Sequence, residues 1–238
     1  MTMFATAAPA PAPTSSPTPA STSMPAMVSR QTSAVMIVDP ASLRAEAIRG
    51  LRTRLMAQHV REGRRGLVVC TPAKGSGCSY VAANLAIAMA QVGVKTVLVD
   101  ADLRGGSLGQ IFGSPIDAPG LSAFLADDRI RARDVIEADI LPHLSLIPSG
   151  PACDAAQELL SSQRFAAFVG QVMREYDLAI FDTTPANSCT DAQRVATLVG
   201  HSLIVARQDQ TYFSDVKALA ALLRADKSAV IGTVLTDY

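Results

Sequence analysis

The sequence lacks several features that mark particular classes of protein. Its 238 residues carry a formal net charge of zero, so the chain as a whole does not favour nucleic acid as a partner. The cysteines follow no metal-ligand spacing, and with three scattered histidines they predict no zinc site. We therefore expect reduced thiols, as in a cytosolic protein. The four cysteines are Cys70, Cys78, Cys153 and Cys189.

Long apolar runs are also missing. The longest apolar segment, residues 81–94, is interrupted by Asn84 and Gln91 and is too short to cross a bilayer. The N-terminus shows no basic segment followed by an apolar one, so no signal peptide is expected. Apolar residues still make up 49% of the chain, which is enough for a large core. We expect a cytoplasmic protein with at most peripheral membrane contact.

Composition divides the chain near residue 35. Six of the fourteen prolines fall within residues 1–34, among alanine, serine and threonine, and Arg30 is the single charged residue there. Such a segment cannot bury enough surface to offset the entropy that it loses on ordering. The sequence therefore predicts a disordered or semi-stiff tail over residues 1–35 and one domain over residues 36–238.

Short apolar runs alternate with helical patterns in this second part. The expected strands cover residues 66–70, 95–100, 144–148, 177–182, 202–206 and 229–235. The expected helices cover residues 42–59, 79–93, 154–175, 190–198 and 211–225, with short helices within 119–138. Unbroken apolar strands suit a sheet that is covered on both faces, and the alternation implies right-handed crossovers. The predicted fold class is α/β, with a mainly parallel sheet flanked by helices.

A glycine-rich turn joins the first of these strands to a long apolar helix. Residues 66–80 read Gly-Leu-Val-Val-Cys-Thr-Pro-Ala-Lys-Gly-Ser-Gly-Cys-Ser-Tyr, which is the architecture of a phosphate-binding loop (P-loop). Gly75 and Gly77 let backbone amides turn inward, and Ser79 offers a hydroxyl to Mg²⁺. The usual ending is Gly-Lys-Ser or Gly-Lys-Thr, but here Cys78 occupies the lysine position.

Two other strand ends carry acids. Asp100 and Asp102 follow the strand at 95–100, and Asp182 ends the strand at 177–182. An acid at such a place is often only a helix cap or a turn former. Ligands of parallel α/β sheets nevertheless bind at the carboxyl ends of the strands, and the three features in this order predict a nucleotide site. One acid can hold a metal-bound water while another accepts a proton from an attacking hydroxyl.

An arginine-rich helix precedes the P-loop. Residues 44–65 contain seven arginines and two acids, and a solvated helix face is the simpler interpretation. A surface that meets anionic lipid or a neighbouring subunit is the alternative. Glu46, Arg49 and Arg52 are spaced i,i+3 and therefore share one face of this helix. By itself that spacing indicates a surface ion-pair ladder, which contributes little to stability.

These segments resemble the bacterial tyrosine kinases (BY-kinases), the cytoplasmic ATPase-like domains of capsule and exopolysaccharide machinery. Residues 100–104, Asp-Ala-Asp-Leu-Arg, are similar to their second Walker motif, and residues 182–185, Asp-Thr-Thr-Pro, to their Walker B motif. Residues 46–52 fit their Glu-x-x-Arg-x-x-Arg segment, which in the family joins neighbouring subunits. The resemblance covers about residues 36–238 and implies the P-loop NTPase fold of the deviant-Walker branch, which includes partitioning ATPases.

The resemblance also implies ligands, partners and residue roles. It implies ATP and Mg²⁺ as ligands, ring-like self-association, and an inner-membrane polysaccharide co-polymerase as partner, which would hold the protein at the inner face of the cell membrane. Asp102 and Asp100 are the expected catalytic pair, and Ser79, Asp100 and Asp182 the expected metal site. The expected nucleotide-binding residues are Lys74, Gly75, Ser76, Gly77, Cys78, Ser79 and Tyr80, and self-association is expected through Glu46, Arg49 and Arg52.

The sequence departs from the family pattern mainly in the P-loop. Lys74 stands where the family has proline, Ser76 where it has glutamate, Cys78 where it has lysine, and Tyr80 where it has serine or threonine. Lys74 is one candidate to reach the phosphates on its flexible stem, and a solvated loop lysine is the alternative. The family's tyrosine-rich C-terminal segment has no counterpart in this sequence, whose tyrosines are Tyr80, Tyr176, Tyr212 and Tyr238.

Three functions therefore stay open at this stage. The first is an ATP-binding tyrosine autokinase of exopolysaccharide or capsule synthesis and export, with weakened catalysis. The second is a catalytically inactive scaffold that assembles with a membrane co-polymerase. The third and least favoured is a partitioning-type ATPase, because such proteins usually show a C-terminal amphipathic helix or a DNA-binding basic patch.

Overall fold

Seven strands form one sheet in the computed structural model, which describes residues 32–115 and 117–237. The strand order is β3-β4-β2-β5-β1-β6-β7, and every ladder is parallel except the edge pair β3–β4. The strands are β1 (Gly66–Cys70), β2 (Thr96–Asp100), β3 (Glu137–Leu141), β4 (Leu144–Ile147), β5 (Leu178–Asp182), β6 (His201–Arg207) and β7 (Ala229–Thr236). The predicted mainly parallel α/β sheet is confirmed.

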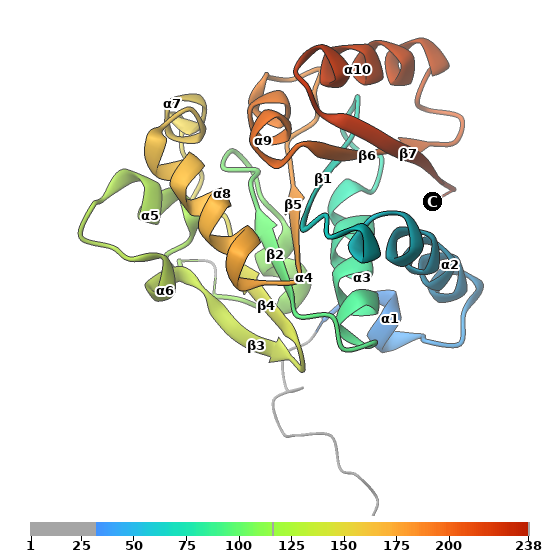
Figure 1. Ribbon diagram of the computed structural model, residues 1–238, viewed down its shortest axis with the longest axis horizontal. Coiled ribbons are helices and arrows are strands. Elements are labelled where there is room, and N and C mark those ends of the chain that lie inside the picture. The colour runs from blue at the N-terminus through green and yellow to red at the C-terminus, as the bar shows by residue number, and fades with distance from the viewer. Residues whose placement is uncertain (1–31, 116, 238) are drawn as a thin grey trace, which may run out of the picture.

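Helices cover both faces of this sheet (Figure 1). One layer contains α1 (Val35–Val38), α2 (Leu43–Gln58), α3 (Cys78–Ala90) and α4 (Leu108–Phe112). The other contains α5 (Leu121–Ala126), α6 (Ala132–Val135), α7 (Ala156–Leu160), α8 (Gln163–Glu175), α9 (Asp191–Val199) and α10 (Phe213–Ala225). A short 3₁₀ turn, η1 (Val60–Glu62), follows α2.

The apolar strands supply both cores because successive side chains point to opposite faces. In β1, Leu67 and Val69 face the layer of α3, whereas Val68 and Cys70 face the layer of α8 and α9. Eleven of the thirteen residues of α3 are buried, since it lies between the sheet and α2. The central strands are therefore packed against helices on both faces.

Several predicted elements differ from the structure. The single helix expected over residues 154–175 is wrong: Ser161 and Ser162 separate α7 from α8, and the Ser162 hydroxyl caps α8 by accepting a hydrogen bond from the Phe165 amide at 3.1 Å. The sequence also gave no indication of α1, α4 or the edge strand β3.

The N-terminal part of the described chain packs on α3. Ala34 and Met36 are buried, and the Met36 amide donates to Oδ1 of Asn84 at 3.0 Å. Asn84 in turn donates from Nδ2 to the Tyr80 carbonyl at 2.9 Å. This polar side chain within the apolar helix therefore links α1 to the first turn of α3. Most of the predicted tail, residues 1–31, lies outside the described residues.

Candidate nucleotide site

The P-loop spans the turn from Cys70, at the end of β1, to Cys78, at the start of α3. Gly75 and Gly77 have φ values of 81° and 77°, in the left-handed region that favours glycine. Nη1 of Arg207 donates to the Gly75 carbonyl at 2.9 Å, and the Thr236 hydroxyl donates to the Ser76 carbonyl at 2.9 Å. These contacts from β6 and β7 occupy two carbonyls of the loop and tie it to the sheet.

A cavity of about 410 Å³ opens over this loop, a size typical of small-molecule sites. All seven residues predicted to bind nucleotide line it. Its lining consists of Thr71, Lys74, Gly75, Ser76, Gly77, Cys78, Ser79, Tyr80, Asp102, Gly105, Ser107, Ile111, Thr183 and Pro185. The Ser76 hydroxyl is turned back onto the Ala73 carbonyl at 2.9 Å.

Asp100 and Asp182 lie side by side on neighbouring strands, and neither of them lines this cavity. They are register partners on β2 and β5, and both are buried. The two oxygens of Asp100 are occupied by backbone donors, the amide of Asp102 at 3.2 Å and the amide of Leu108 at 3.0 Å. Burial, followed by the neighbouring Asp182 carboxylate, raises the pKa of Asp100 well above its ordinary value. Asp100 thus braces the loop that leads into α4.

Asp182 is the less satisfied of the two acids. Neither of its carboxylate oxygens has a hydrogen-bond partner within the described residues, although the side chains of Ser79 and Cys78 lie close to it. Burial raises the pKa of Asp182 to about 6. The nearby side chains of Ser79 and then Cys78 act in the opposite direction, because a donor close to the carboxylate favours its charged form and lowers the pKa. A buried carboxylate without a partner, next to a serine hydroxyl and a second acid, is a donor set that suits Mg²⁺. The residues present therefore fit the metal that the P-loop implies.

Cys78 brings no positive charge to the site. Its thiol is buried against the sheet, and burial, together with the nearby Asp182 carboxylate, raises its pKa well above the ordinary range. The thiol is therefore neutral at physiological pH. Lys74 is exposed at the rim of the cavity, and its amine contacts no acid or hydrogen-bond acceptor among the residues that the structure describes.

Asp102 also lines the cavity. Its Oδ1 accepts from the amides of Arg104 at 3.1 Å and Gly105 at 3.0 Å, in a tight turn. The carboxylate is half-buried, so it can meet solvent or a second substrate. Tyr80 is half-buried on the same cavity, and burial raises the pKa of its phenol.

Gly106 is a site residue that the sequence did not reveal. A Cβ atom there would lie 2.3 Å from the Ser149 hydroxyl and 2.4 Å from Oδ2 of Asp100. Only glycine therefore lets the loop after Asp102 close onto Asp100 and the segment after β4. Gly105 and Gly106 stand out as a pair in the sequence, but the pair does not show that Gly106 approaches Ser149, a residue more than forty positions away.

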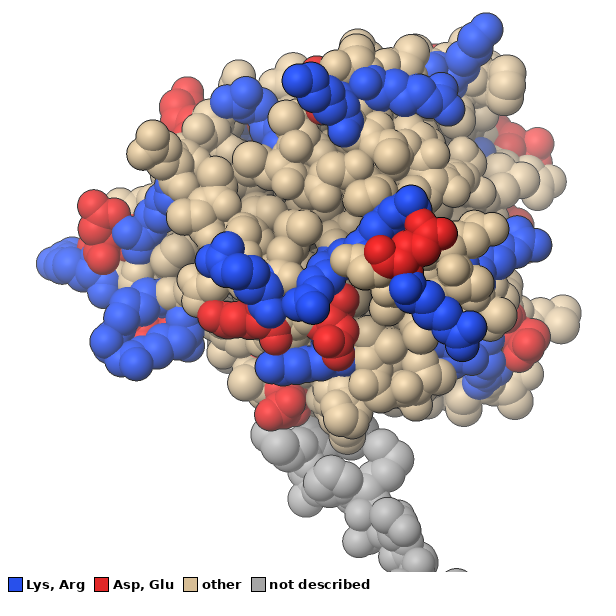
Figure 2. Space-filling model, viewed as in Figure 1, with Lys and Arg blue, Asp and Glu red and all other residues tan. Residues whose placement is uncertain are grey.

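The three residues expected to mediate self-association lie on α2, and none of them lines the P-loop cavity. Nη1 of Arg49 pairs with Glu46 at 3.1 Å, and its Nη2 donates to the Pro40 carbonyl at 2.6 Å. Arg52 donates to the Ala88 carbonyl of α3 at 3.5 Å. On the face shown in Figure 2, positive and negative side chains are interspersed rather than gathered by sign.

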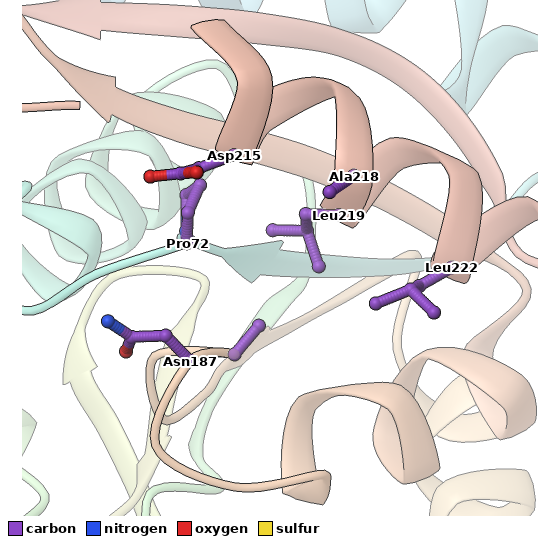
Figure 3. A pocket seen from close by; sticks show the side chains of 7 residues that line it. Pro72, Asn187, Asp215, Ala218, Leu219 and Leu222 are labelled. Atoms are coloured by element: carbon purple, nitrogen blue, oxygen red, sulfur yellow. The ribbon is translucent and has the colours of Figure 1, made fainter. Parts of the chain in front are cut away.

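A second cavity, of about 190 Å³, is lined by Pro72, by Ala186 and Asn187, and by residues of α10. Figure 3 shows Leu219 and Leu222 of α10 facing the loop that carries Asn187, with Asp215 near Pro72. None of the residues predicted to bind nucleotide or metal lines it. In the described part of the chain, no helix is long and apolar enough to span a bilayer, and no three His, Cys, Asp or Glu side chains gather as a metal site.

Comparison with known proteins agrees with this geometry. A family model described as an AAA domain matches residues 67–227. CapB of Staphylococcus aureus, whose name describes a tyrosine-protein kinase, is 31% identical over 82% of this chain and 85% of its own length. The tyrosine-protein kinase Wzc of Salmonella typhi is 30% identical over 84% of this chain, which spans 27% of that relative.

Solved structures support the same assignment. The chimerical protein CapA2B2 is 31% identical, with a TM-score of 0.79 over 86% of this chain and 90% of that one. The kinase domain of the Escherichia coli tyrosine kinase ETK is 28% identical, with a TM-score of 0.82 over 87% and 81%. The cell-division ATPase MinD of Pyrococcus furiosus, at 22% identity and a TM-score of 0.63, shares the fold. The chain therefore belongs to the bacterial tyrosine kinase (BY-kinase) family of capsular P-loop ATPases.

Proposed function

We propose that this protein binds Mg-ATP in the P-loop cavity and transfers a phosphoryl group to a tyrosyl hydroxyl at a reduced rate, within a system for exopolysaccharide or capsule synthesis and export. The observation that carries the proposal is the unpartnered, buried Asp182 carboxylate beside Ser79 and Asp100. Leaving such a carboxylate buried and unpaired is costly, and a bound cation would satisfy it.

The P-loop and the acids at the strand ends have separate roles in this proposal. The amides of residues 75–79 would receive the phosphates, and Ser79, Asp182 and Asp100 would hold the metal. When bound, Mg²⁺ neutralises charge on the phosphate oxygens. Asp102 would accept the proton of the tyrosyl hydroxyl. The tyrosyl oxygen would form its bond to the γ-phosphorus while the bond between the γ-phosphorus and the ADP oxygen breaks.

The reduced rate follows from Cys78. Removing one preorganised donor to developing charge costs roughly 3 kcal/mol, or a hundred- to thousand-fold in rate. The backbone nest and the acids are intact, so binding should suffer less than turnover. Lys74 lies on the rim of the same cavity and is the candidate replacement, provided that its flexible stem reaches the phosphates.

A second candidate function is favoured by the same residue. Because the Cys78 thiol is buried and neutral, the protein would act as a regulatory scaffold if Lys74 does not take over. It would then bind nucleotide, or leave the site empty, and work through assembly. Contacts through the face of Glu46, Arg49 and Arg52 would serve self-association, and an inner-membrane polysaccharide co-polymerase would be the partner in either case. The third option, a partitioning-type ATPase, is the least favoured.

Two measurements separate these functions. Calorimetric titration with Mg-ADP and Mg-ATP tests binding, and incubation with labelled ATP tests transfer to tyrosine. The variants are Cys78→Lys, which restores the usual donor, and Asp182→Asn, which removes the carboxylate. Asp177→Asn, at the exposed N-terminal end of the same strand region, is the matched control.

We expect Mg-nucleotide binding to wild type and to Asp177→Asn, and its loss in Asp182→Asn. Labelled tyrosine in wild type, with at least ten-fold more in Cys78→Lys, supports the kinase. Label that appears only in Cys78→Lys supports the scaffold. No heat of binding for any variant at millimolar Mg-nucleotide would refute the proposed function.

A further inference from the structure

Asp191, in the first turn of α9, is a buried acid that the proposed chemistry does not use. Its side chain is fully buried, and its Oδ2 accepts from Nε of Arg104 at 2.8 Å. Its Oδ1 has no hydrogen-bond partner in the described part of the chain. Asp191 also lies at the N-terminal end of α9, where the helix dipole favours a negative charge. A buried charge of this kind is tolerated only when it is paired, and Arg104 is its ion-pair partner.

Arg104 belongs to the turn that forms around Asp102. Its amide, with that of Gly105, donates to Oδ1 of Asp102. Its guanidinium does not line the P-loop cavity, whereas Asp102 and Gly105 do. Hydrogen bonding to Asp191 is the main reason that the pKa of Arg104 is raised. The Arg104 side chain therefore extends from the cavity wall to α9, and is anchored there.

The residues on either side of this turn are fixed independently. The Leu103 side chain is buried, and its carbonyl accepts from the Cys153 amide at 2.8 Å. Asp100 accepts from the Leu108 amide at 3.0 Å. Between these anchors, the segment 104–105 is exposed, and the Arg104–Asp191 pair is the ion pair that ties it to the body of the fold.

We infer that Asp191 is a positioning residue: through Arg104 it fixes the turn whose amides aim the Asp102 carboxylate into the nucleotide cavity. The inference rests on the proposed function, since it gives Asp102 a proton to accept. A positioning role for this ion pair differs from a purely structural role in what its removal changes. A structural ion pair would change stability alone, whereas a positioning pair changes the mobility of residues 101–107 and the transfer step that depends on Asp102.

The first experiment needs no activity. Hydrogen exchange is followed by mass spectrometry in wild type, Asp191→Asn and Arg104→Gln. Asp191→Asn keeps the shape of the side chain and removes its charge. Asp128→Asn, which breaks the exposed Arg164–Asp128 pair, is the control for loss of an ion pair elsewhere. Arg104→Gln tests the same link from the exposed side if Asp191→Asn folds poorly.

We expect exchange in peptides covering residues 101–107 to become at least ten-fold faster in both variants of the Arg104–Asp191 pair. Peptides covering residues 71–79 should exchange as in wild type, and Asp128→Asn should change neither region. Unchanged exchange over residues 101–107 in both variants would overturn the inference, whatever the protein's activity.

The second experiment tests the consequence for transfer. In the Cys78→Lys background, which supplies the usual donor, Asp191→Asn should lower kcat ten- to hundred-fold with less than two-fold change in the Kd for Mg-ADP. Added to Asp102→Asn, the same change should have no further effect, because both act on one group. With Asp191 intact, Arg104→Lys, which keeps the positive charge, should lower kcat less than Arg104→Gln does. An undiminished effect of Asp191→Asn on top of Asp102→Asn would contradict a role through Asp102. Absence of transfer in every variant would refute the proposed function and leave the exchange result standing.

Discussion

Replacing Asp182 by asparagine should stabilise the metal-free protein while abolishing its response to Mg-nucleotide. The Asp182 carboxylate is buried, both oxygens lack partners in the described structure, and its pKa is raised from 3.8 to about 6. At 1.36 kcal/mol per pKa unit, this rise corresponds to a destabilisation of roughly 3 kcal/mol at neutral pH. Asparagine keeps the shape of the side chain and carries no charge.

The sign of the pH dependence follows from the direction of this pKa change. Below pH 3.8 the carboxyl group is protonated in both the folded and the unfolded chain, so the charge costs nothing. Between pH 3.8 and about 6 the unfolded chain ionises first, and the cost to the folded state grows. Above pH 6 the cost is complete. The advantage of Asp182→Asn should therefore be largest above pH 6 and vanish near pH 4.

Thermal unfolding in EDTA is the appropriate assay. For a chain of this size, 3 kcal/mol corresponds to roughly 6–12 °C in Tm, so Asp182→Asn should melt higher than wild type at pH 7.5 by about that amount. With Mg-ADP at a hundred times its Kd, wild type should gain about 2.7 kcal/mol and Asp182→Asn almost nothing. If Asp182→Asn melted lower than wild type at pH 7.5 in EDTA, the carboxylate would have a stabilising partner and our reasoning would be refuted.

Three further predictions concern the stability of the fold. His59 is buried with its Nδ1 unpartnered and its pKa lowered from 6.5 to about 4, first by burial and then by His201, so it is neutral in the fold. The folded-state pKa of His59 lies below the unfolded value, so its contribution to the free energy of unfolding is complete above pH 6.5 and is lost between pH 6.5 and 4. The stability difference between wild type and His59→Gln, measured by urea unfolding, should therefore shrink by roughly 3 kcal/mol over that range. A constant difference would contradict this account. Gly106→Ala should lower Tm and Mg-nucleotide affinity together, because its Cβ would lie 2.4 Å from Oδ2 of Asp100, whereas Gly105→Ala, with nothing within 4 Å, should leave both unchanged. Phe168→Ala should cost about 3–5 kcal/mol in urea unfolding without altering nucleotide affinity, since the ring lies in the core between Phe124 and Phe165; a loss under 1 kcal/mol would show that the core relaxes around it.

The sequence predicted the centre of the sheet better than the edge formed by β3. The strands β1, β2 and β5 are buried on both faces and therefore read as unbroken apolar runs. The edge strand β3 is Glu-Ala-Asp-Ile-Leu, half exposed, with one neighbour and an irregular register. Its strand conformation comes from pairing with β4 rather than from its own pattern. The break between α7 and α8 was likewise masked, because apolar residues continue the helical pattern across the two capping serines.

The site divides in the same way. Asp100 and Asp182 could be placed together because adjacent parallel strands end at the same edge of a sheet. The P-loop could be recognised because its glycines follow a strand and precede a helix. The links that hold these parts could not be predicted, since they join segments far apart in the sequence: Arg207 to Gly75, Thr236 to Ser76, and Arg104 to Asp191. None of these pairs follows a periodic pattern or a motif.

The lysine-to-cysteine departure changes the electrostatics of the whole site. Asp100 and Asp182 are two adjacent buried acids with raised pKa values, and the residue that precedes Ser79 supplies a neutral thiol instead of a cation. In the absence of metal, the protein relieves this repulsion by binding protons more readily, which is what the raised pKa values express. A P-loop lysine would offset part of the same charge from within the chain. Without it, the positive charge must come from Mg²⁺, from Lys74 or from a partner. Nucleotide binding by this chain should therefore depend more strongly on the divalent cation than binding by relatives that keep the lysine.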